Sequence, residues 1–301
     1  MEELVVISGK GGTGKTSIVA SFATLAENAV LADCDVDAAD LHLVLEPAVT
    51  HREEFSGGSQ AAILSQHCIA CGKCQELCRF DAISHDGPAN GKVDKTYRVD
   101  PIACEGCGVC AHFCEEQAIE FAPVVNGELF VSETRRGSMV HAKLGVAAEN
   151  SGKLVSLVRT QAKQLAEHES SKLIIVDGPP GIGCPVIASV TGASLVLVIT
   201  EPTLSGEHDL QRVLQLASGF GIPAAVCVNK WDLNPSMAER IEDKARAAGA
   251  EIAGRVRYDT EVTTAQVQAQ ATVERRCQAA DDIRDLWTNL KNIGSKHGLR
   301  I

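Results

Sequence analysis

Two groups of cysteines repeat one spacing in the middle of the chain. Residues 68–78 read CIACGKCQELC and residues 104–114 read CEGCGVCAHFC, so both follow the pattern C-x2-C-x2-C-x3-C. These groups hold eight of the twelve cysteines of the 301-residue chain. Regularly spaced cysteines in a reducing compartment are typical metal ligands, since disulfides are rare there. The spacing therefore predicts metal or metal-cluster chemistry in this segment.

A second kind of site lies near residue 10. The stretch GKGGTGKT (9–16) satisfies G-x-x-x-x-G-K-[ST], after the apolar run LVVIS (4–8) and before the helical stretch 16–28. In such a loop, backbone N–H groups converge on phosphate oxygens, the lysine reaches the β- and γ-phosphates and the following hydroxyl holds Mg²⁺. We expect a nucleoside triphosphate with Mg²⁺ to be bound by Gly9, Lys10, Gly11, Gly12, Thr13, Gly14, Lys15, Thr16 and Ser17.

Apolar strand-like runs alternate with helical stretches on both sides of the cysteine segment. The predicted strands are 4–8, 29–33, 173–177, 195–200, 224–229 and 251–256, and the later predicted helices lie near 153–168, 205–218 and 236–248. Continuous apolar strands with helices between them are typical of a parallel sheet covered on both faces. The expected fold class is α/β, with a nucleotide-binding parallel sheet and an inserted small α+β domain.

The alternation stops between about residues 50 and 130. There the two cysteine groups align as an internal repeat, CIACGKCQELCRFDAIS against CEGCGVCAHFCEEQAIE. The pair Asn126-Gly127 predicts a hairpin turn behind it. We expect a nucleotide-binding domain formed by residues 1–59 and 123–301, interrupted by an inserted domain at 60–122.

The second lysine of the loop, Lys10, makes this stretch similar to the deviant Walker A motif. That motif marks the MinD superfamily of P-loop ATPases, which includes the nitrogenase iron protein and the Mrp-type cluster carriers. The resemblance implies an ATP-sandwich homodimer in which Lys10 reaches the partner's nucleotide. A positive charge supplied in trans would stabilise the transferring phosphoryl group, as an arginine finger does.

The same resemblance assigns further roles. ADCDVD places Asp35 at the switch I aspartate, LIIVDGPPG places Asp177 at the Walker B position, and VNKWD places Asn229 where the superfamily reads the purine base. NKWD also matches the guanine signature N-K-x-D, with Asp232 in the discriminating place, but the rest of the chain resembles ATPases. The implied catalytic residues are Lys10, Lys15 and Asp35, and the implied Mg²⁺ ligands are Thr16, Asp35 and Asp177.

The cysteine repeat resembles bacterial 2[4Fe–4S] ferredoxins, in which each cluster takes three cysteines of one group and the fourth of the other. Arg79 and Glu115 stand where proline usually follows the fourth cysteine. Zinc is the alternative, since four thiolates suffice for one ion. The resemblance implies one cluster on Cys68, Cys71, Cys74 and Cys114 and another on Cys104, Cys107, Cys110 and Cys78.

Another cysteine, Cys184, lies seven residues after Asp177, where the nitrogenase iron protein has a cluster ligand. A bridging cluster needs a second cysteine from each subunit, and residues 133–153 contain none. A redox or metal-transfer role and a structural or nucleotide-sensing role both stay open. The remaining cysteines, Cys34, Cys227 and Cys277, are expected to be small buried side chains.

Two interpretations are possible for a polar stretch after residue 140. It either couples the inserted domain to the nucleotide site or forms an ordinary surface helix. Its polar members are His141, Lys143, Asn150 and Lys153.

The charge of the chain restricts its partners. A net charge of −11 and a pI of about 5.3 disfavour nucleic acid and anionic membranes. Within residues 60–122, five Lys or Arg face nine Asp or Glu, a formal −4 that suits a positively charged docking partner. The apolar face of residues 283–293 predicts a helix packed on the sheet. With no leader or spanning segment recognised, we expect a cytoplasmic protein.

Together these features predict a slow ATPase in which nucleotide state gates electron transfer from two [4Fe–4S] clusters to an unidentified redox partner. A cluster scaffold or carrier, and a MinD-like switch with redox-sensing clusters, are the alternatives.

Overall fold

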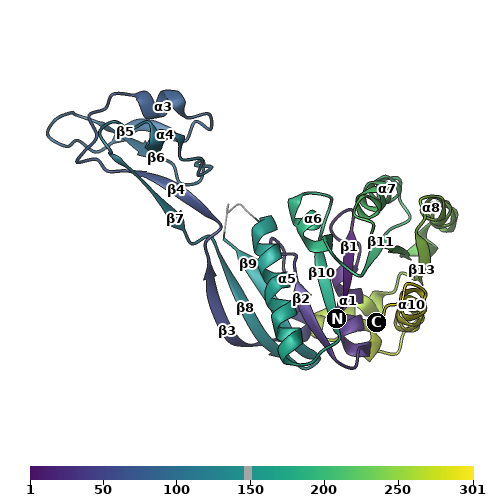
Figure 1. Cartoon of the computed structure of the whole chain (residues 1–301). Helices are drawn as coiled ribbons and strands as arrows, with labels where there is room; N and C mark the ends of the chain where they lie inside the picture. Colours follow the sequence, from purple (N-terminus) through teal and green to yellow (C-terminus); the bar gives the residue numbers. More distant parts are fainter. Residues whose placement is uncertain (146–150) are drawn as a thin grey trace. The chain divides into compact units, whose positions relative to one another are not determined.

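The computed structural model describes residues 1–145 and 151–301. These residues divide into two compact units, each with its own elements (Figure 1). The first, here called the ATPase unit, comprises Met1–Glu53, Glu128–Leu144 and Ser151–Ile301. The second, here called the cysteine unit, comprises Glu54–Gly127 and Gly145. The unit boundary therefore lies several residues outside the span 60–122 on both sides.

Within the described residues, nine strands of one sheet run in the order β13-β12-β11-β1-β10-β2-β9-β8-β3. Each neighbouring pair from β13 to β9 is parallel, as the continuous apolar runs predict. The strands are β1 (Glu2–Ser8), β2 (Ala29–Asp33), β3 (Ala48–Phe55), β8 (Gly127–Thr134), β9 (Gly137–Leu144), β10 (Leu173–Pro180), β11 (Leu195–Thr200), β12 (Ala224–Asn229) and β13 (Glu251–Val256).

Helices cover both faces of this sheet. They are α1 (Lys15–Leu25), α2 (Leu41–Leu45), α5 (Ser151–His168), α6 (Cys184–Val190), α7 (Leu204–Gly219), α8 (Pro235–Ala247), α9 (Thr260–Val267) and α10 (Gln278–Lys296), with 3-10 turns η1 (Trp231–Leu233) and η2 (Thr272–Glu274). Side chains alternate between the faces of a strand, and in β1 both Leu4 and its neighbour Val5 are fully buried. The α/β architecture with two covered faces is therefore confirmed.

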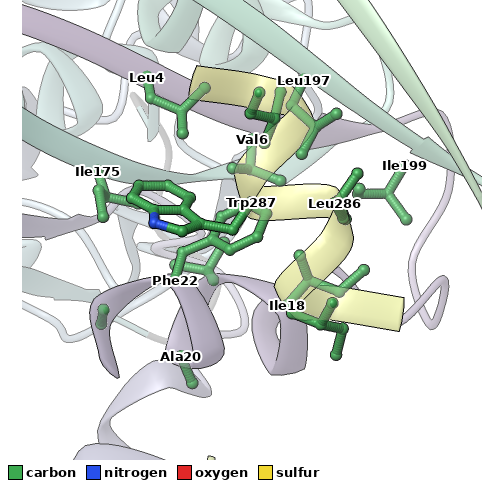
Figure 2. Packing of buried hydrophobic residues seen from close by; sticks show 14 of the residues in the cluster. Leu4, Val6, Ile18, Ala20, Phe22, Ile175, Leu197, Ile199, Leu286 and Trp287 are labelled. Carbon is green, nitrogen blue, oxygen red and sulfur yellow. The ribbon is translucent and has the colours of Figure 1, made fainter. Parts of the chain in front are cut away.

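One face of the sheet packs against α1 and α10. Figure 2 shows Leu4, Val6 and Leu197 of the strands meeting Phe22 of α1 and Trp287 of α10. The two rings are tilted, with their centroids 4.9 Å apart. The apolar face of α10 is buried in this core, so the helix predicted at the C-terminus is confirmed as a packing helix. No helix in the described ranges is long and apolar enough to cross a membrane.

The cysteine unit contains two small antiparallel sheets. β4 (Gly58–Ile63) pairs with β7 (Ile119–Val124), and β5 (Ile83–Gly87) pairs with β6 (Thr96–Val99). Each cysteine group contributes one short helix, α3 (Lys73–Leu77) or α4 (Val109–His112), and these helices contact each other. The sequence repeat thus corresponds to a repeated local structure.

The prediction of a hairpin turn at Asn126-Gly127 is wrong. β7 and β8, which flank this pair, belong to different sheets. The Asn126 N–H donates to the Phe55 carbonyl at 2.9 Å, and its Oδ1 accepts from the Gly57 N–H at 2.8 Å. These bonds join the segment that leaves the cysteine unit, at Asn126, to the segment that enters it, at Phe55 and Gly57.

Candidate nucleotide site and cysteine cavities

The phosphate loop links β1 to the eleven-residue helix α1. Gly14 has φ of 84°, a left-handed conformation that favours glycine. A Cβ on Gly14 would also lie 2.4 Å from Nδ2 of Asn229. Because the first N–H groups of a helix lack partners within it, the N-terminus of α1 is suited to bind an anion.

A cavity of about 650 Å³ lies over this loop, within the size range of small-molecule sites. It brings together most of the residues predicted to bind nucleotide, whereas Gly9, Lys10 and Asp177 are not in its lining. Gly9 instead allows close packing on α7, since a Cβ there would lie 2.3 Å from Cβ of Asp209. The predicted residues that line the cavity are Gly11, Gly12, Thr13, Gly14, Lys15, Thr16, Ser17, Asp35 and Asn229.

Lys15 is buried among carboxylates. Its Nζ lies 2.5 Å from Oδ1 of Asp177 and 3.6 Å from Oδ2 of Asp35. Burial opposes the charge on Lys15, but the attraction of Asp177, then of Asp35 and Asp33, outweighs it, so the pKa of Lys15 is raised. The chain thus uses Lys15 to neutralise its own acidic residues.

One of the carboxylates around Lys15 is a candidate cation ligand. Oδ2 of Asp177 is buried and has no hydrogen-bond partner among the described residues, which fits a place in a Mg²⁺ shell. Burial raises the pKa of Asp35 to about 6, with Lys15 opposing and Asp177 reinforcing the shift. Burial and then Asp177 raise the pKa of Asp33 well above its usual value. A divalent cation would relieve this concentration of negative charge.

Asn229 contacts the phosphate loop directly. Its Nδ2 donates to the Thr13 carbonyl at 2.7 Å, and its Oδ1 accepts from the Lys230 N–H at 3.0 Å. The side chain therefore supports the loop, a role that the resemblance did not indicate.

Lys10 pairs within its own chain. Its Nζ lies 3.3 Å from Oε2 of Glu201 and 3.5 Å from Oγ of Ser205. The other Glu201 oxygen, Oε1, lies 2.6 Å from Nζ of Lys230. Glu201 thus holds two lysines beside the phosphate loop. It was not singled out from the sequence, because a lone glutamate after a strand carries no recognisable signal.

Sequence reasoning also missed two residues that line the cavity. Tyr258 and Gln266 line it, and Nε2 of Gln266 donates to Oγ of Ser17 at 2.8 Å, which joins α9 to α1. No motif marks either residue, because their place depends on how α9 packs.

The eight repeated cysteines line two cavities in the cysteine unit. The cavity of about 260 Å³ is lined by Cys68, Cys71, Cys74, Cys110 and Cys114. The other cavity, of about 20 Å³, is lined by Cys78, Cys104, Cys107 and Cys110. Each cavity therefore includes three cysteines of one group and the fourth of the other, and Cys110 lines both cavities.

The thiols differ in exposure. Cys71 and Cys107 are exposed, whereas Cys68 is buried. Burial raises the pKa of the Cys74 thiol to about 11, with Cys68 and Cys71 among the groups that add to the shift. Across residues 1–145 and 151–301, no group of three or more His, Cys, Asp or Glu is arranged to hold a single metal ion.

The remaining cysteines lie in the ATPase unit. Cys34 and Cys227 are buried as predicted, and Cys277 is half-buried. Cys184 is exposed at the first residue of α6, and a Cβ on Gly152 of α5 would lie 3.4 Å from its Cβ. The start of α5 thus packs directly on Cys184.

Of the polar stretch after residue 140, His141 is buried on β9, and its Nε2 lies 2.9 Å from Oγ of Ser132. Burial, and then the nearby His42, lower its pKa to about 4. Neither His141 nor Lys143 lines the nucleotide cavity. Lys153 lies in the first turn of α5, and Asn150 lies outside the described residues.

Comparison with protein families gives a match over most of the chain. The family described as the CobQ/CobB/MinD/ParA nucleotide binding domain matches residues 4–273. The uncharacterized protein MJ0578 of Methanocaldococcus jannaschii is 35% identical over 242 residues, which are 77% of this chain and 79% of that protein.

Solved structures show the same fold. The cell division ATPase MinD of Pyrococcus furiosus has a TM-score of 0.58 and 15% identity, over 97% of this chain and 99% of that one. MinD of Pyrococcus horikoshii, complexed with Mg-ADP, has a TM-score of 0.57 and 14% identity, over 98% of each chain.

Proposed function

This chain belongs to the CobQ/CobB/MinD/ParA nucleotide-binding family, and from that premise we propose a dimeric, Mg-ATP-hydrolysing protein in which nucleotide state gates electron transfer from two [4Fe–4S] clusters to a protein partner. The lining of two cavities by the eight cysteines, each with three members of one group and the fourth of the other, is the observation that carries the proposal.

The cysteine unit supplies the ligands. Thiolates of a cubane cluster attach to different iron atoms, so they surround a volume instead of meeting at one ion, and the lining of two cavities by the eight cysteines supports this ligand type. When bound, the clusters would accept and donate single electrons. One cluster would be held by Cys68, Cys71, Cys74 and Cys114, and the other by Cys104, Cys107, Cys110 and Cys78.

The ATPase unit supplies the hydrolytic groups. Lys15 would leave Asp177 for the phosphates of ATP, and Asp177, with Thr16 and Asp35, would then serve the Mg²⁺ shell. Asp35 would orient the attacking water. Lys10 would leave Glu201 and reach the nucleotide of a second subunit, since its side chain is partly exposed at the loop.

A hydrogen-bonded path would carry the nucleotide state toward the insert. Oδ1 of Asp33 accepts from the Asp35 N–H at 3.2 Å, and its Oδ2 accepts from the Leu41 N–H at 3.3 Å. Leu41 begins α2, which leads through β3 into the cysteine unit. Movement of Asp35 on ATP binding would therefore reach the start of the insert.

The ligand assignment is tested by replacing two cysteines of each group, one at a time. The anaerobically purified chain should hold about eight iron atoms, and Cys114→Ser should impair the same cluster as Cys71→Ser. Cys78→Ser should instead impair the cluster that Cys107→Ser impairs. Cys277→Ser is the control and should impair neither. Electron paramagnetic resonance distinguishes the clusters, and a Cys114→Ser spectrum that matched Cys107→Ser would refute the crossed assignment.

Gating is tested by titrating the cluster potentials with and without a saturating Mg-ATP analogue. Linkage requires that a tenfold effect of nucleotide on the redox equilibrium shift a one-electron potential by about 59 mV. Lys15→Ala, which should not bind nucleotide, should show no shift. Stable clusters whose potential and rate of electron delivery ignore nucleotide would refute gating.

A carrier of whole clusters is the second candidate, favoured by the exposure of Cys71 and Cys107. Incubation of the dithionite-reduced chain with an apo-ferredoxin and, separately, with an oxidised holo-ferredoxin separates the two functions. A carrier would pass iron to the apo-ferredoxin, whereas an electron-transfer protein would keep its iron and reduce the holo-ferredoxin. Partner binding that changes with oxidation state, without reduction of any acceptor, would indicate a redox-sensing switch.

A further inference from the structure

Asp232 accepts a hydrogen bond from the backbone of a loop that is distant in sequence. Its Oδ1 accepts from the Tyr258 N–H at 2.7 Å, across 26 residues of the chain. Asp232 does not line the nucleotide cavity, although Asn229 and Lys230 of the same NKWD stretch do. The position that the motif would give to a guanine-reading carboxylate is therefore occupied by a residue that holds a loop.

The loop it holds is fixed by carboxylates at three successive residues. The Arg257 N–H donates to Oδ2 of Asp282 at 2.9 Å, and its guanidinium donates to both oxygens of Asp282 at 2.8 and 2.6 Å. Tyr258 is bound by Asp232, and Oδ1 of Asp259 accepts from the Glu261 N–H at 3.0 Å at the start of α9. These bonds restrict the backbone of residues 257–259.

This loop forms part of the wall of the nucleotide cavity. Arg257, Tyr258 and Asp259 all line it, and the Tyr258 side chain is 52% exposed. A tyrosine ring at such a wall can stack on a nucleobase, because every base has a π-face. Stacking alone does not distinguish the purines.

Discrimination between the purines depends on hydrogen bonds. Guanine presents an N1–H and an exocyclic amino group, which need acceptors when they are buried, and an unpaired buried donor is costly. A free carboxylate in the cavity would accept from both donors, but Asp232 does not line the cavity and one of its oxygens accepts from the Tyr258 N–H. Asp232 therefore does not present this acceptor pair to a base in the cavity, which disfavours guanine.

We propose that Asp232 is a positioning residue that holds the Tyr258 segment against the base of a bound adenine nucleotide and does not read guanine. The inference rests on the nucleotide-binding part of the proposed function, and it is independent of the clusters.

Equilibrium binding of Mg-ATP, Mg-GTP and Mg-XTP by calorimetry tests it. The wild type should prefer ATP over GTP by about tenfold or more. Asp232→Asn keeps an oxygen that accepts from the Tyr258 N–H, so it should retain ATP affinity and gain no XTP binding. Asp232→Ala loses the acceptor and should bind ATP roughly tenfold more weakly. A guanine-reading aspartate behaves differently, because its Asn variant would accept xanthine.

Two further variants isolate the ring. Tyr258→Ala should lower ATP affinity about tenfold, whereas Tyr258→Phe should retain it, since the backbone N–H that Asp232 holds is unchanged. Asp243→Asn is the matched control, because its side chain is exposed on α8. Circular dichroism checks that each variant is folded.

The outcomes separate this inference from the proposed function. Tight GTP binding by the wild type, with XTP binding by Asp232→Asn, would overturn the role of Asp232 and leave a nucleotide-driven protein intact. Unchanged ATP affinity in folded Asp232→Ala or Tyr258→Ala would overturn it too. Failure of the wild type to bind any of the three nucleotides would overturn both.

Discussion

Replacing Asn229 by alanine should weaken the binding of any polyphosphate, whether or not it carries a base. The Asn229 amide is 8% exposed and donates to the Thr13 carbonyl at 2.7 Å, so its loss leaves a carbonyl of the phosphate loop without this partner. A buried group deprived of its hydrogen bond costs about 1–3 kcal/mol. If the loop must recover its shape on binding, that energy lowers affinity by roughly 5- to 150-fold.

Calorimetry with Mg-ATP and with base-free Mg-tripolyphosphate measures this effect. Both affinities should fall by a similar factor, because the loop contacts only the phosphates. Asn289→Ala is the matched control: its Nδ2 donates to the Ala253 carbonyl at 2.9 Å, and its loss should affect stability but not phosphate binding. A fall confined to ATP would show that Asn229 reads the base, and would refute the reasoning from loop support.

Three other predictions concern the ATPase unit. Trp287→Ala removes a ring 4.9 Å from that of Phe22 and should lower the free energy of unfolding by about 3–5 kcal/mol in urea denaturation; a loss under 1 kcal/mol would contradict this packing. His141 stays neutral in the folded chain down to about pH 4, while the unfolded chain takes up a proton near pH 6.5. The wild type should therefore lose roughly 2 kcal/mol of stability between pH 6.5 and 4 that His141→Asn does not lose, as denaturation at each pH would measure. Lys10→Ala should retain ATP binding but slow phosphate release by about 10³ and abolish ATP-dependent dimers in sedimentation, and a hydrolysing dimer of this variant would exclude a role in trans.

The sheet was predictable because its strands are apolar throughout. Buried parallel strands carry no polar alternation, so runs such as AVLAD and LVLVIT mark β2 and β11 to the residue. The phosphate loop was predictable for a different reason, since its glycines and Lys15 meet steric and electrostatic needs within one short stretch. The ligand sets of the cysteines came from a resemblance and stay a prediction.

What the sequence did not reveal depends on contacts between distant residues. Asn126-Gly127 has the composition of a hairpin turn, yet the bonding of Asn126 to Phe55 and Gly57 gives it another task. Asp232 likewise matches a guanine motif, and only the fold brings the Tyr258 N–H to it. The pairing of Lys15 with Asp177 also could not be predicted from the sequence. A motif indicates which ligand a residue binds, but not which residue its side chain contacts when the ligand is absent.

The hydrogen bond between Asn126 and Phe55 also bears on how such a chain could arise and be altered. The nitrogen of Asn126 lies 2.9 Å from the carbonyl oxygen of Phe55, so the two ends of the insert are side by side. For the strands that flank it, the whole unit is therefore equivalent to one closed loop. The entropy of closing a flexible loop changes by only about 0.6 kcal/mol for each doubling of its length. A single insertion event could therefore have supplied the cysteine unit without unfolding its host. By the same geometry, we expect that residues 56–125 can be exchanged for another small domain whose termini lie equally close.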